Sequence, residues 1–167
     1  ISDMPINSFS DKYMALKNAK LLINAGADMV KIEGDNDIID VVKHLSANKI
    51  FVCGHIGCMP QVNKIKNLPN EDLLTKAKNL EEAGLKMLVM SMTSESDDQT
   101  ITNQLSIPTI GFRSSLFCNG EVEVLYDLIG ISSTPNFNAQ KETGKIEHLT
   151  ILDKIENFIK KIHTRKN

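Results

Sequence analysis

Short apolar runs alternate with helix-like segments along most of this chain. The apolar runs cover residues 29–32, 50–53, 87–90, 109–112 and 128–131. Runs this short and this uniformly apolar are typical of strands buried on both faces. Strands that alternate with helices along a chain form parallel sheets, since each helix carries the chain back to the start of the next strand. The order of these segments therefore predicts an α/β protein.

Apolar residues at helical spacing mark the segments between these runs. The expected helices cover residues 10–25, 37–46, 70–83, 96–105 and 148–163. Two of them end at Gly26 and Gly84, which are good C-cap residues, and a buried strand follows each glycine in the same register. Such repetition favours a (β/α)8 barrel over a Rossmann sheet, because the glycine-rich phosphate motif of the latter is missing.

The first residues of the sequence resemble the end of a strand and the loop after it. With residues 1–5 included, about six strands are visible, whereas a barrel of this class has about eight. We therefore expect an incomplete (β/α)8 TIM barrel that lacks its first strands and forms one partial-barrel domain over residues 1–167. An open barrel leaves sheet edges unpaired, which favours association with a second copy or with the missing barrel portion.

Composition and charge narrow the class of protein. The chain is 41% hydrophobic and 24% charged, with a net charge of −2, so nothing favours binding to nucleic acid or to an anionic membrane. It shows no apolar run of membrane-spanning length, and we expect no signal peptide. The three cysteines, Cys53, Cys58 and Cys118, form an odd set without the spacing of a zinc site. This usage favours the reducing cytoplasm.

Charged residues follow the expected strand at 29–32. Lys31 and Glu33 are two positions apart, so both side chains point to the same face, and the carboxyl ends of barrel strands are where chemistry occurs. A buried ammonium or carboxylate is costly unless it is paired or binds a ligand, so the two form either a structural ion pair or a site. Asp3, at the preceding strand end, is either a loop residue or a partner of Glu33 in holding Mg²⁺. His55 follows the next strand, at the expected mouth.

Several segments resemble the ketopantoate hydroxymethyltransferase family. Residues 27–34 (Ala-Asp-Met-Val-Lys-Ile-Glu-Gly) are similar to its G-A-D-x-V-K-(I/L)-E-G motif. Residues 52–61 (Val-Cys-Gly-His-Ile-Gly-Cys-Met-Pro-Gln) are similar to V-x-G-H-(I/L)-G-L-T-P-Q. Residues 2–5 match A-D-(L/M)-P-F, and residues 107–111 match the start of I-P-V-I-G-I-G-A-G. The resemblance extends from residue 1 to about residue 131.

The resemblance implies a fold and an activity. The family has a (β/α)8 barrel of the phosphoenolpyruvate/pyruvate type and forms large homo-oligomers. It transfers the one-carbon unit of 5,10-methylenetetrahydrofolate to 3-methyl-2-oxobutanoate, giving 2-dehydropantoate on the route to pantothenate. By resemblance, Asp3 and Glu33 would bind Mg²⁺, Asp3 and Lys31 would contact the oxo-acid, and His55 would donate a hydrogen bond nearby. The partners would be small molecules, the oxo-acid and the folate.

The chain departs from the family at the general base. Residues 88–94 (Leu-Val-Met-Ser-Met-Thr-Ser) stand against L-V-L-E-C-V-P, so Ser91 replaces the glutamate that removes the proton. General-base catalysis typically contributes about 10²–10⁴-fold, and whether Glu95 or His55 compensates stays open. The metal- and substrate-binding V-G-D-S-(L/M)-G motif belongs before residue 1, and the loop at 62–69 is shortened. Phe112 and Arg113 replace small residues at a later strand end.

Three interpretations remain open at this point. The chain is a hydroxymethyltransferase, a catalytically impaired remnant of one, or another Mg²⁺-dependent oxo-acid lyase on the same barrel. We favour the first interpretation, because the motifs indicate that the chain shares its ancestry with that family. For this chain alone we expect weak or absent activity, because it lacks both the base and one metal-binding motif.

Overall fold

Parallel strands and helices alternate through the first two thirds of the chain. The computed structural model describes residues 1–34, 36–58, 73–113, 117–131 and 149–164. Contacts between residues divide the chain into two compact units, Ile1–Asn119 and Gly120–Asn167. The expectation of one domain over residues 1–167 stays a prediction.

The strands of the first unit pair in the order in which they occur along the chain. Each strand lies parallel to the next, from β1 through to β5. The strands are β1 (Ser2–Asp3), β2 (Val30–Glu33), β3 (Val52–Gly57), β4 (Met87–Ser91) and β5 (Thr109–Phe112). Parallel neighbours in sequence order are the arrangement of a (β/α)8 barrel. Because the described residues contain six strands and a full barrel has about eight, the predicted incomplete barrel is confirmed.

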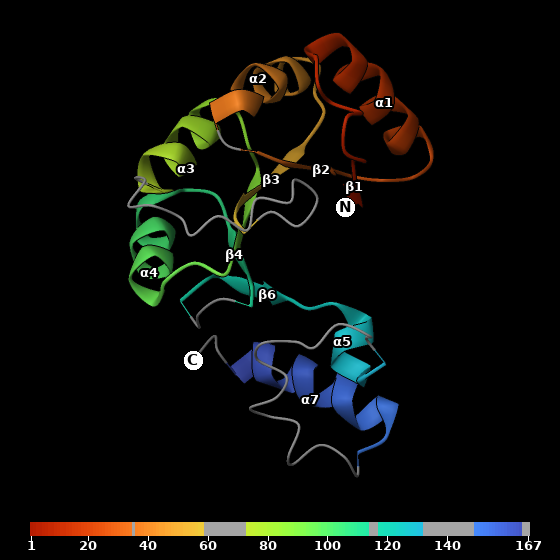
Figure 1. The fold of residues 1–167 in the computed structure, drawn as a ribbon, viewed down its shortest axis with the longest axis vertical. Coiled ribbons are helices and arrows are strands. Elements are labelled where there is room, and N and C mark those ends of the chain that lie inside the picture. Colours follow the sequence, from red (N-terminus) through yellow and green to blue (C-terminus); the bar gives the residue numbers. More distant parts are fainter. Residues whose placement is uncertain (35, 59–72, 114–116, 132–148, 165–167) are drawn as a thin grey trace. The chain divides into compact units, whose positions relative to one another are not determined.

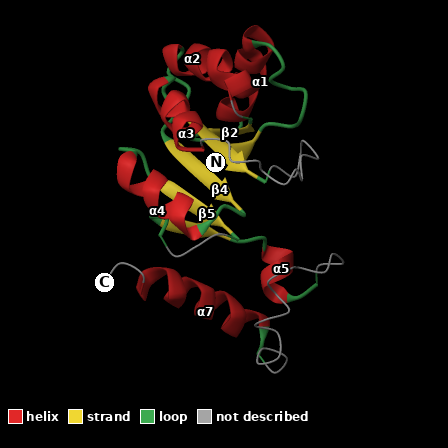
Figure 2. Ribbon diagram, turned by 60° about the vertical axis from the view of Figure 1, so that its left-hand side comes forward, coloured by secondary structure: helices red, strands yellow, loops and turns green. Residues whose placement is uncertain are grey.

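A helix follows each of the first four strands and returns the chain to the start of the next one. The helices of this unit are α1 (Lys12–Asn24), the 3-10 turn η1 (Asn36–Ile38), α2 (Ile39–Ala47), α3 (Leu73–Glu82) and α4 (Glu95–Gln104). Figure 1 shows the helices α1 to α4 in an arc outside the strands, and Figure 2 shows them along one side of the sheet. The side chain of Asp11 caps α1 by accepting hydrogen bonds from the backbone N–H groups of Tyr13 and Met14, at 2.8 and 3.1 Å.

Alternate strand residues divide between two environments. One set packs with the helices in the hydrophobic core and is fully buried; its members are Val30, Ile32, Val52, Ile56, Leu88 and Met90. The intervening residues Lys31, Glu33, Cys53, His55 and Ser91 point to the opposite face, because successive side chains of a strand alternate. In a barrel this second face is the interior.

The second unit contains one short strand and two described helices, β6 (Gly120–Val122), α5 (Leu125–Ile129) and α7 (Ile151–Thr164). The ammonium of Lys154 in α7 donates a hydrogen bond to the carbonyl oxygen of Ile129, at 3.1 Å. Helix α7 begins after Thr150, whose hydroxyl accepts from the N–H of Asp153 at 3.2 Å while the Asp153 carboxylate accepts from the N–H of Thr150 at 2.9 Å. This exchange of hydrogen bonds fixes the start of the helix.

Most expected elements are present, with shifted ends. The strands expected at 29–32, 50–53, 87–90 and 109–112 are β2 to β5, and β3 continues to Gly57. The strand expected at 128–131 is wrong, since Leu128 and Ile129 form the end of α5 and Gly130 is its C-cap. The helix expected at 37–46 begins as a 3-10 turn, and the loop at 62–69 lies outside the described residues. No described helix is long and apolar enough to span a membrane.

Candidate active site

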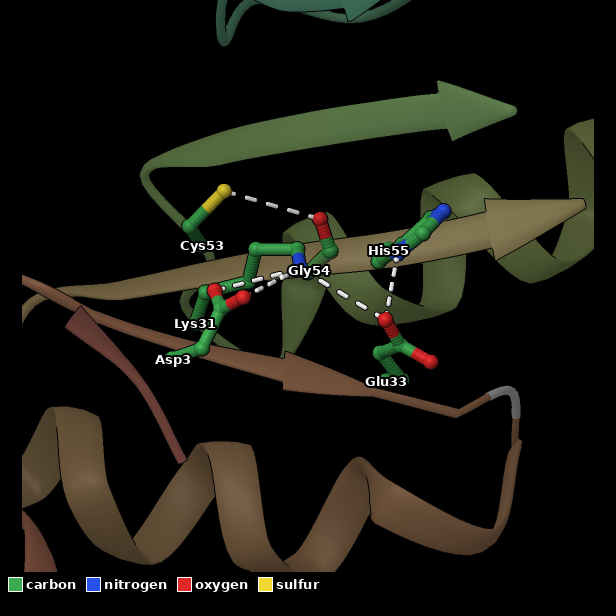
Figure 3. Close-up of polar contacts among 6 residues, drawn as sticks. All are labelled: Asp3, Lys31, Glu33, Cys53, Gly54 and His55. Carbon is green, nitrogen blue, oxygen red and sulfur yellow. Dashed lines mark hydrogen bonds and ion pairs between the residues drawn. The ribbon is translucent and has the colours of Figure 1, made fainter. Parts of the chain in front are cut away.

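Three neighbouring strands bring the polar residues of the inner face together. In the parallel register Asp3 lies opposite Lys31 and Lys31 opposite Cys53, while Glu33 lies opposite His55. Because parallel strands hold opposed residues side by side, these side chains form two adjacent rows near the carboxyl ends of the strands. Figure 3 shows the cluster from β1, β2 and β3.

The ammonium of Lys31 lies between two carboxylates. Its Nζ is 3.1 Å from Oδ1 and 3.2 Å from Oδ2 of Asp3, and 3.5 Å from Oε1 of Glu33 (Figure 3). Asp3 remains open to solvent, with 56% of its side chain exposed, whereas the Lys31 and Glu33 side chains are only 17% and 5% exposed. Lys31 thus joins the two carboxylates, and the three charged groups form one cluster on the inner face.

Glu33 also holds His55. Nδ1 of His55 lies 3.0 Å from Oε1 of Glu33, and both side chains are buried. A carboxylate can only accept a hydrogen bond. Nδ1 therefore carries the proton, and its N–H donates a hydrogen bond to Glu33. Burial lowers the pKa of His55 below its ordinary value, against the opposing pull of Glu33, so the imidazole is neutral at pH 7.

The observed place of His55 differs from the expected one. It was expected in the loop after the strand, and the structure places it inside β3 with 3% of its surface exposed. The donor role implied by the resemblance is taken by Nδ1, which faces Glu33. The other nitrogen, Nε2, is buried and has no hydrogen-bond partner in the described part of the chain.

Ser91 lies at the end of β4, on the same face as His55 but one residue pair further along. In the register His55 lies opposite Val89, and Ser91 lies between Gly57 and Phe112. The serine is buried, at 1% exposure. Its hydroxyl is a poor base, since it carries no negative charge near pH 7.

Glu95 is the first residue of α4 and is exposed. Among the described residues it has no hydrogen bond or ion pair with Ser91, His55 or Glu33. The structure thus brings Asp3, Lys31, Glu33 and His55 together and leaves Glu95 apart from them.

Gly57 allows β3 and β4 to approach closely beside Ser91. Its φ is +91°, and a Cβ atom here would collide with the carbonyl oxygen of Ser91. That carbonyl accepts a hydrogen bond from the N–H of Cys58 at 2.9 Å. The glycine therefore fixes the position of the strand end that carries Ser91.

Cys53 of β3 also points to the inner face, beside Lys31. It is fully buried and opposite Lys31, and burial raises the pKa of its thiol to about 11, despite the opposing charge of Lys31. The thiol therefore stays protonated near pH 7 and is no nucleophile. Its position two residues before His55 is the signal that places it on the inner face.

Comparison with known proteins identifies the ancestry of this cluster. The family model for ketopantoate hydroxymethyltransferase matches residues 1–166. The chain belongs to this family. A curated 3-methyl-2-oxobutanoate hydroxymethyltransferase of Buchnera aphidicola (subsp. Acyrthosiphon pisum, strain 5A) is 39% identical over 160 residues, which cover 88% of this chain and 61% of that relative. One from Shewanella sp. (strain MR-4) is 38% identical over 159 residues, which cover 87% of this chain and 60% of that relative.

The chain spans about three fifths of the length of these hydroxymethyltransferases. A solved structure of a candidate lyase/mutase from Burkholderia cenocepacia J2315 aligns with a TM-score of 0.54 at 12% identity, covering 66% of this chain and 45% of the other. At that identity the likeness concerns the fold alone, and it supports the α/β barrel class.

The donor set of this family member is suited to a hard divalent cation. Mg²⁺ takes oxygen ligands, and it typically binds one or two carboxylates with water and substrate oxygens completing the shell. Asp3 and Glu33 supply two carboxylates that converge on a cation, which here is the Lys31 ammonium. In the described residues no group of three or more His, Cys, Asp and Glu side chains could hold a metal ion.

Proposed function

We propose that this chain carries the oxo-acid site of an enzyme that transfers the one-carbon unit of 5,10-methylenetetrahydrofolate to 3-methyl-2-oxobutanoate, giving 2-dehydropantoate for pantothenate biosynthesis. Membership of the family and the names of the curated relatives support this activity. One observation carries the proposal. The cluster of Asp3, Lys31, Glu33 and His55 lies on the inner face of neighbouring strands, near their carboxyl ends.

Each residue of the cluster has a role in this proposal. The Lys31 ammonium binds the carboxylate of the oxo-acid and stabilises the negative charge of its enolate. Asp3 and Glu33 would hold Mg²⁺, which would supply a Lewis acid for the keto oxygen of the substrate. The His55 imidazole holds the Glu33 carboxylate in place through Nδ1.

The serine at position 91 indicates a form of this enzyme with weakened catalytic activity. The family's base position holds a buried hydroxyl, and Glu95 makes no contact with the cluster within the described residues. Because a lost general base typically costs about 10²–10⁴-fold, the chain alone would bind the oxo-acid but turn it over slowly. A catalytically impaired member of the family is therefore the second candidate function.

The composition of the chain supports a proposal for its ligands and its cellular compartment. Small molecules, the oxo-acid and the folate, are the proposed ligands, since the net charge of −2 gives no attraction for nucleic acid. All three cysteines are free, which suits a reducing compartment, and we place the protein in the cytoplasm. We further propose that the chain associates with other copies of itself or with the rest of the barrel.

The test measures binding and turnover separately on the purified chain. Isothermal titration with 3-methyl-2-oxobutanoate and Mg²⁺ is expected to show binding, and Lys31→Gln is expected to weaken it about tenfold or more. Lys86→Gln, which removes an exposed lysine just before β4, is the matched control. Absence of oxo-acid binding would contradict the proposed function.

Turnover with 5,10-methylenetetrahydrofolate is expected to be about 10²–10⁴-fold below that of the Buchnera relative. Equal turnover would contradict the proposed impairment. Cleavage of a carbon–carbon bond in an oxo-acid without folate would instead favour the lyase alternative.

A further inference from the structure

The carboxyl end of β5 carries an aromatic side chain and a cation next to each other. Phe112 is the last residue of β5 and lies opposite Ser91, so its side chain is on the inner face of the sheet. The guanidinium carbon of Arg113 lies 5.0 Å from the centroid of the Phe112 ring. A guanidinium is attracted by the negative face of an aromatic ring, and it can still donate hydrogen bonds within its own plane. The ring therefore holds the cation at the strand end.

The backbone at this edge of the sheet adopts an uncommon conformation twice. Arg113 has a φ of +51°, and Met92, the residue after β4, has a φ of +52°. Residues other than glycine rarely adopt this left-handed conformation, and those that do are found preferentially at functional sites. The N–H of Met92 donates a hydrogen bond to the carbonyl oxygen of Phe112, at 3.3 Å, and so joins the two strand ends. Arg113 is thus fixed at the same edge of the sheet as the charged cluster, because parallel strands share their carboxyl edge.

The strands between Arg113 and Lys31 keep the two cations apart. Because β3 and β4 lie between β2 and β5, three strand spacings of about 4.8 Å separate them, which is about 14 Å along the sheet. The ammonium of Lys31 is held by the carboxylates of Asp3 and Glu33, and the guanidinium of Arg113 by the ring on its own strand. The oxo-acid has a single carboxylate, next to its keto carbon, and this carboxylate cannot occupy both places. Arg113 therefore suits a second anionic group, at a distance from the keto carbon.

We propose that Arg113 binds a glutamate carboxylate of the folate co-substrate and thereby aligns the one-carbon donor with the oxo-acid. This inference rests on the proposed function. In 5,10-methylenetetrahydrofolate the reactive methylene belongs to the ring system, whereas the glutamate carboxylates lie beyond the benzoyl group, at the other end of the molecule. A folate with its methylene near Lys31 and a carboxylate at Arg113 would extend along the carboxyl edge from β2 to β5. A guanidinium matches a carboxylate in shape and charge and can bind it through two parallel hydrogen bonds.

The experiment compares two ligands that differ only at the glutamate. They are tetrahydrofolate and its diamide, in which neutral amides replace both glutamate carboxylates. Their binding to the unaltered chain is measured by isothermal titration, with the oxo-acid and Mg²⁺ at saturation. Tetrahydrofolate should bind about tenfold more tightly or better, which is the gain typical of a hydrogen bond between charged groups. Equal affinity of the two ligands would overturn the proposal, and this comparison needs no altered protein.

Replacement of Arg113 then assigns the preference to this residue. Arg113→Gln should bind tetrahydrofolate about tenfold more weakly and should no longer distinguish it from the diamide, while the affinity for the oxo-acid is unchanged. Arg113→Lys keeps the charge but loses the planar fork, so it should retain only part of the preference. Lys86→Gln is the matched control, because it removes an exposed lysine at the start of β4, and it should keep the full preference.

Two results with Arg113→Gln would overturn the inference and leave the proposed function in place. One is an undiminished preference for tetrahydrofolate over the diamide. The other is a weaker affinity for the oxo-acid with no change in the affinity for tetrahydrofolate. Failure of the unaltered chain to bind either folate would instead contradict the proposed transfer from folate.

Discussion

Lys31 occupies the position between Asp3 and Glu33 that a shared metal ion would also favour. Its ammonium lies 3.1 Å from Asp3 and 3.5 Å from Glu33. A unit charge and a divalent ion repel strongly in a partly buried site, because water screens them less there than in solution. In the proposed function, the lysine would therefore influence the metal affinity of this site as well as its affinity for the oxo-acid.

Replacing Lys31 by methionine is expected to tighten metal binding in the absence of oxo-acid. Met keeps an unbranched side chain and removes the positive charge, so Mn²⁺, a spectroscopic substitute for Mg²⁺, should bind roughly tenfold more tightly. Electron paramagnetic resonance of free Mn²⁺ measures the dissociation constant. Lys86→Met is the control, and equal affinity in the two variants would show that Lys31 does not compete with the metal.

The sequence predicts part of this residue-scale picture. Lys31 and Glu33 share a face because of their spacing alone, and that face is the one observed. The contact between Glu33 and His55 depends on the register of β2 against β3, which arises from the pairing of segments far apart in the chain. For the same reason we expected His55 after its strand, and we did not expect Cys53 to lie near Lys31.

Glu81 shows how one element holds the next. This residue of α3 accepts hydrogen bonds through Oε1 from the N–H and hydroxyl of Ser106, both at 2.7 Å, and from the N–H of Ile107 at 3.2 Å. Desolvation acts to raise the pKa of Glu81, but the hydrogen bonds from Ser106 and Ile107 together outweigh it, and the pKa is lowered. The carboxylate thereby fixes the turn that leads into β5.

The lowered pKa of Glu81 predicts a pH-dependent contribution to stability. A carboxyl group whose pKa is lower in the folded than in the unfolded state stabilises the fold above its ordinary pKa, and this stabilisation is lost as pH falls through the folded value. Glu81→Gln should lower the free energy of unfolding by about 1 kcal/mol at pH 7, with a smaller difference at pH 3. Urea unfolding at both pH values measures it. Glu82→Gln, an exposed neighbour, should change little, and a loss of equal size at both pH values would contradict the prediction.

Strands and helices were predicted correctly where the apolar pattern of the sequence was clear and well separated from its neighbours. Strands β2 to β5 are predicted because each is an apolar run between helical segments. The run at 128–131 is too short for periodicity to separate a strand from a helix, and the structure ends α5 there with Gly130 at φ +81°. Strand β6 (Gly120–Val122) was missed because three residues that include a glycine and a glutamate carry no strand signal.

At the scale of the whole molecule, the described strands form part of an α/β barrel. It spans about three fifths of the curated relatives, and the described strands are fewer than the eight or so of a closed barrel. The order of strands and helices predicts this architecture, because short buried runs separated by helices allow few other folds. The division of the chain into two units lacks any comparable signal in the sequence.

An open parallel sheet predicts association of the purified chain. Unpaired strand edges and exposed apolar side chains favour contact with another copy. Such side chains in the second unit include Tyr126, Ile131 and Leu152, which are 62%, 64% and 71% exposed. Light scattering coupled to size-exclusion chromatography should give a mass above 18.6 kDa that rises with protein concentration. A monomer at every concentration tested would contradict this prediction.

The alternation of side chains along β2 and β3 separates the determinants of folding from those of reactivity. Val30, Ile32 and Val52 secure the scaffold against the helices, while Lys31, Glu33 and Cys53 point to the opposite face. Evolution can therefore exchange one set of positions without disturbing the other. A protein built on this plan can change a side chain of the inner face and still keep the packing that holds its strands and helices in place.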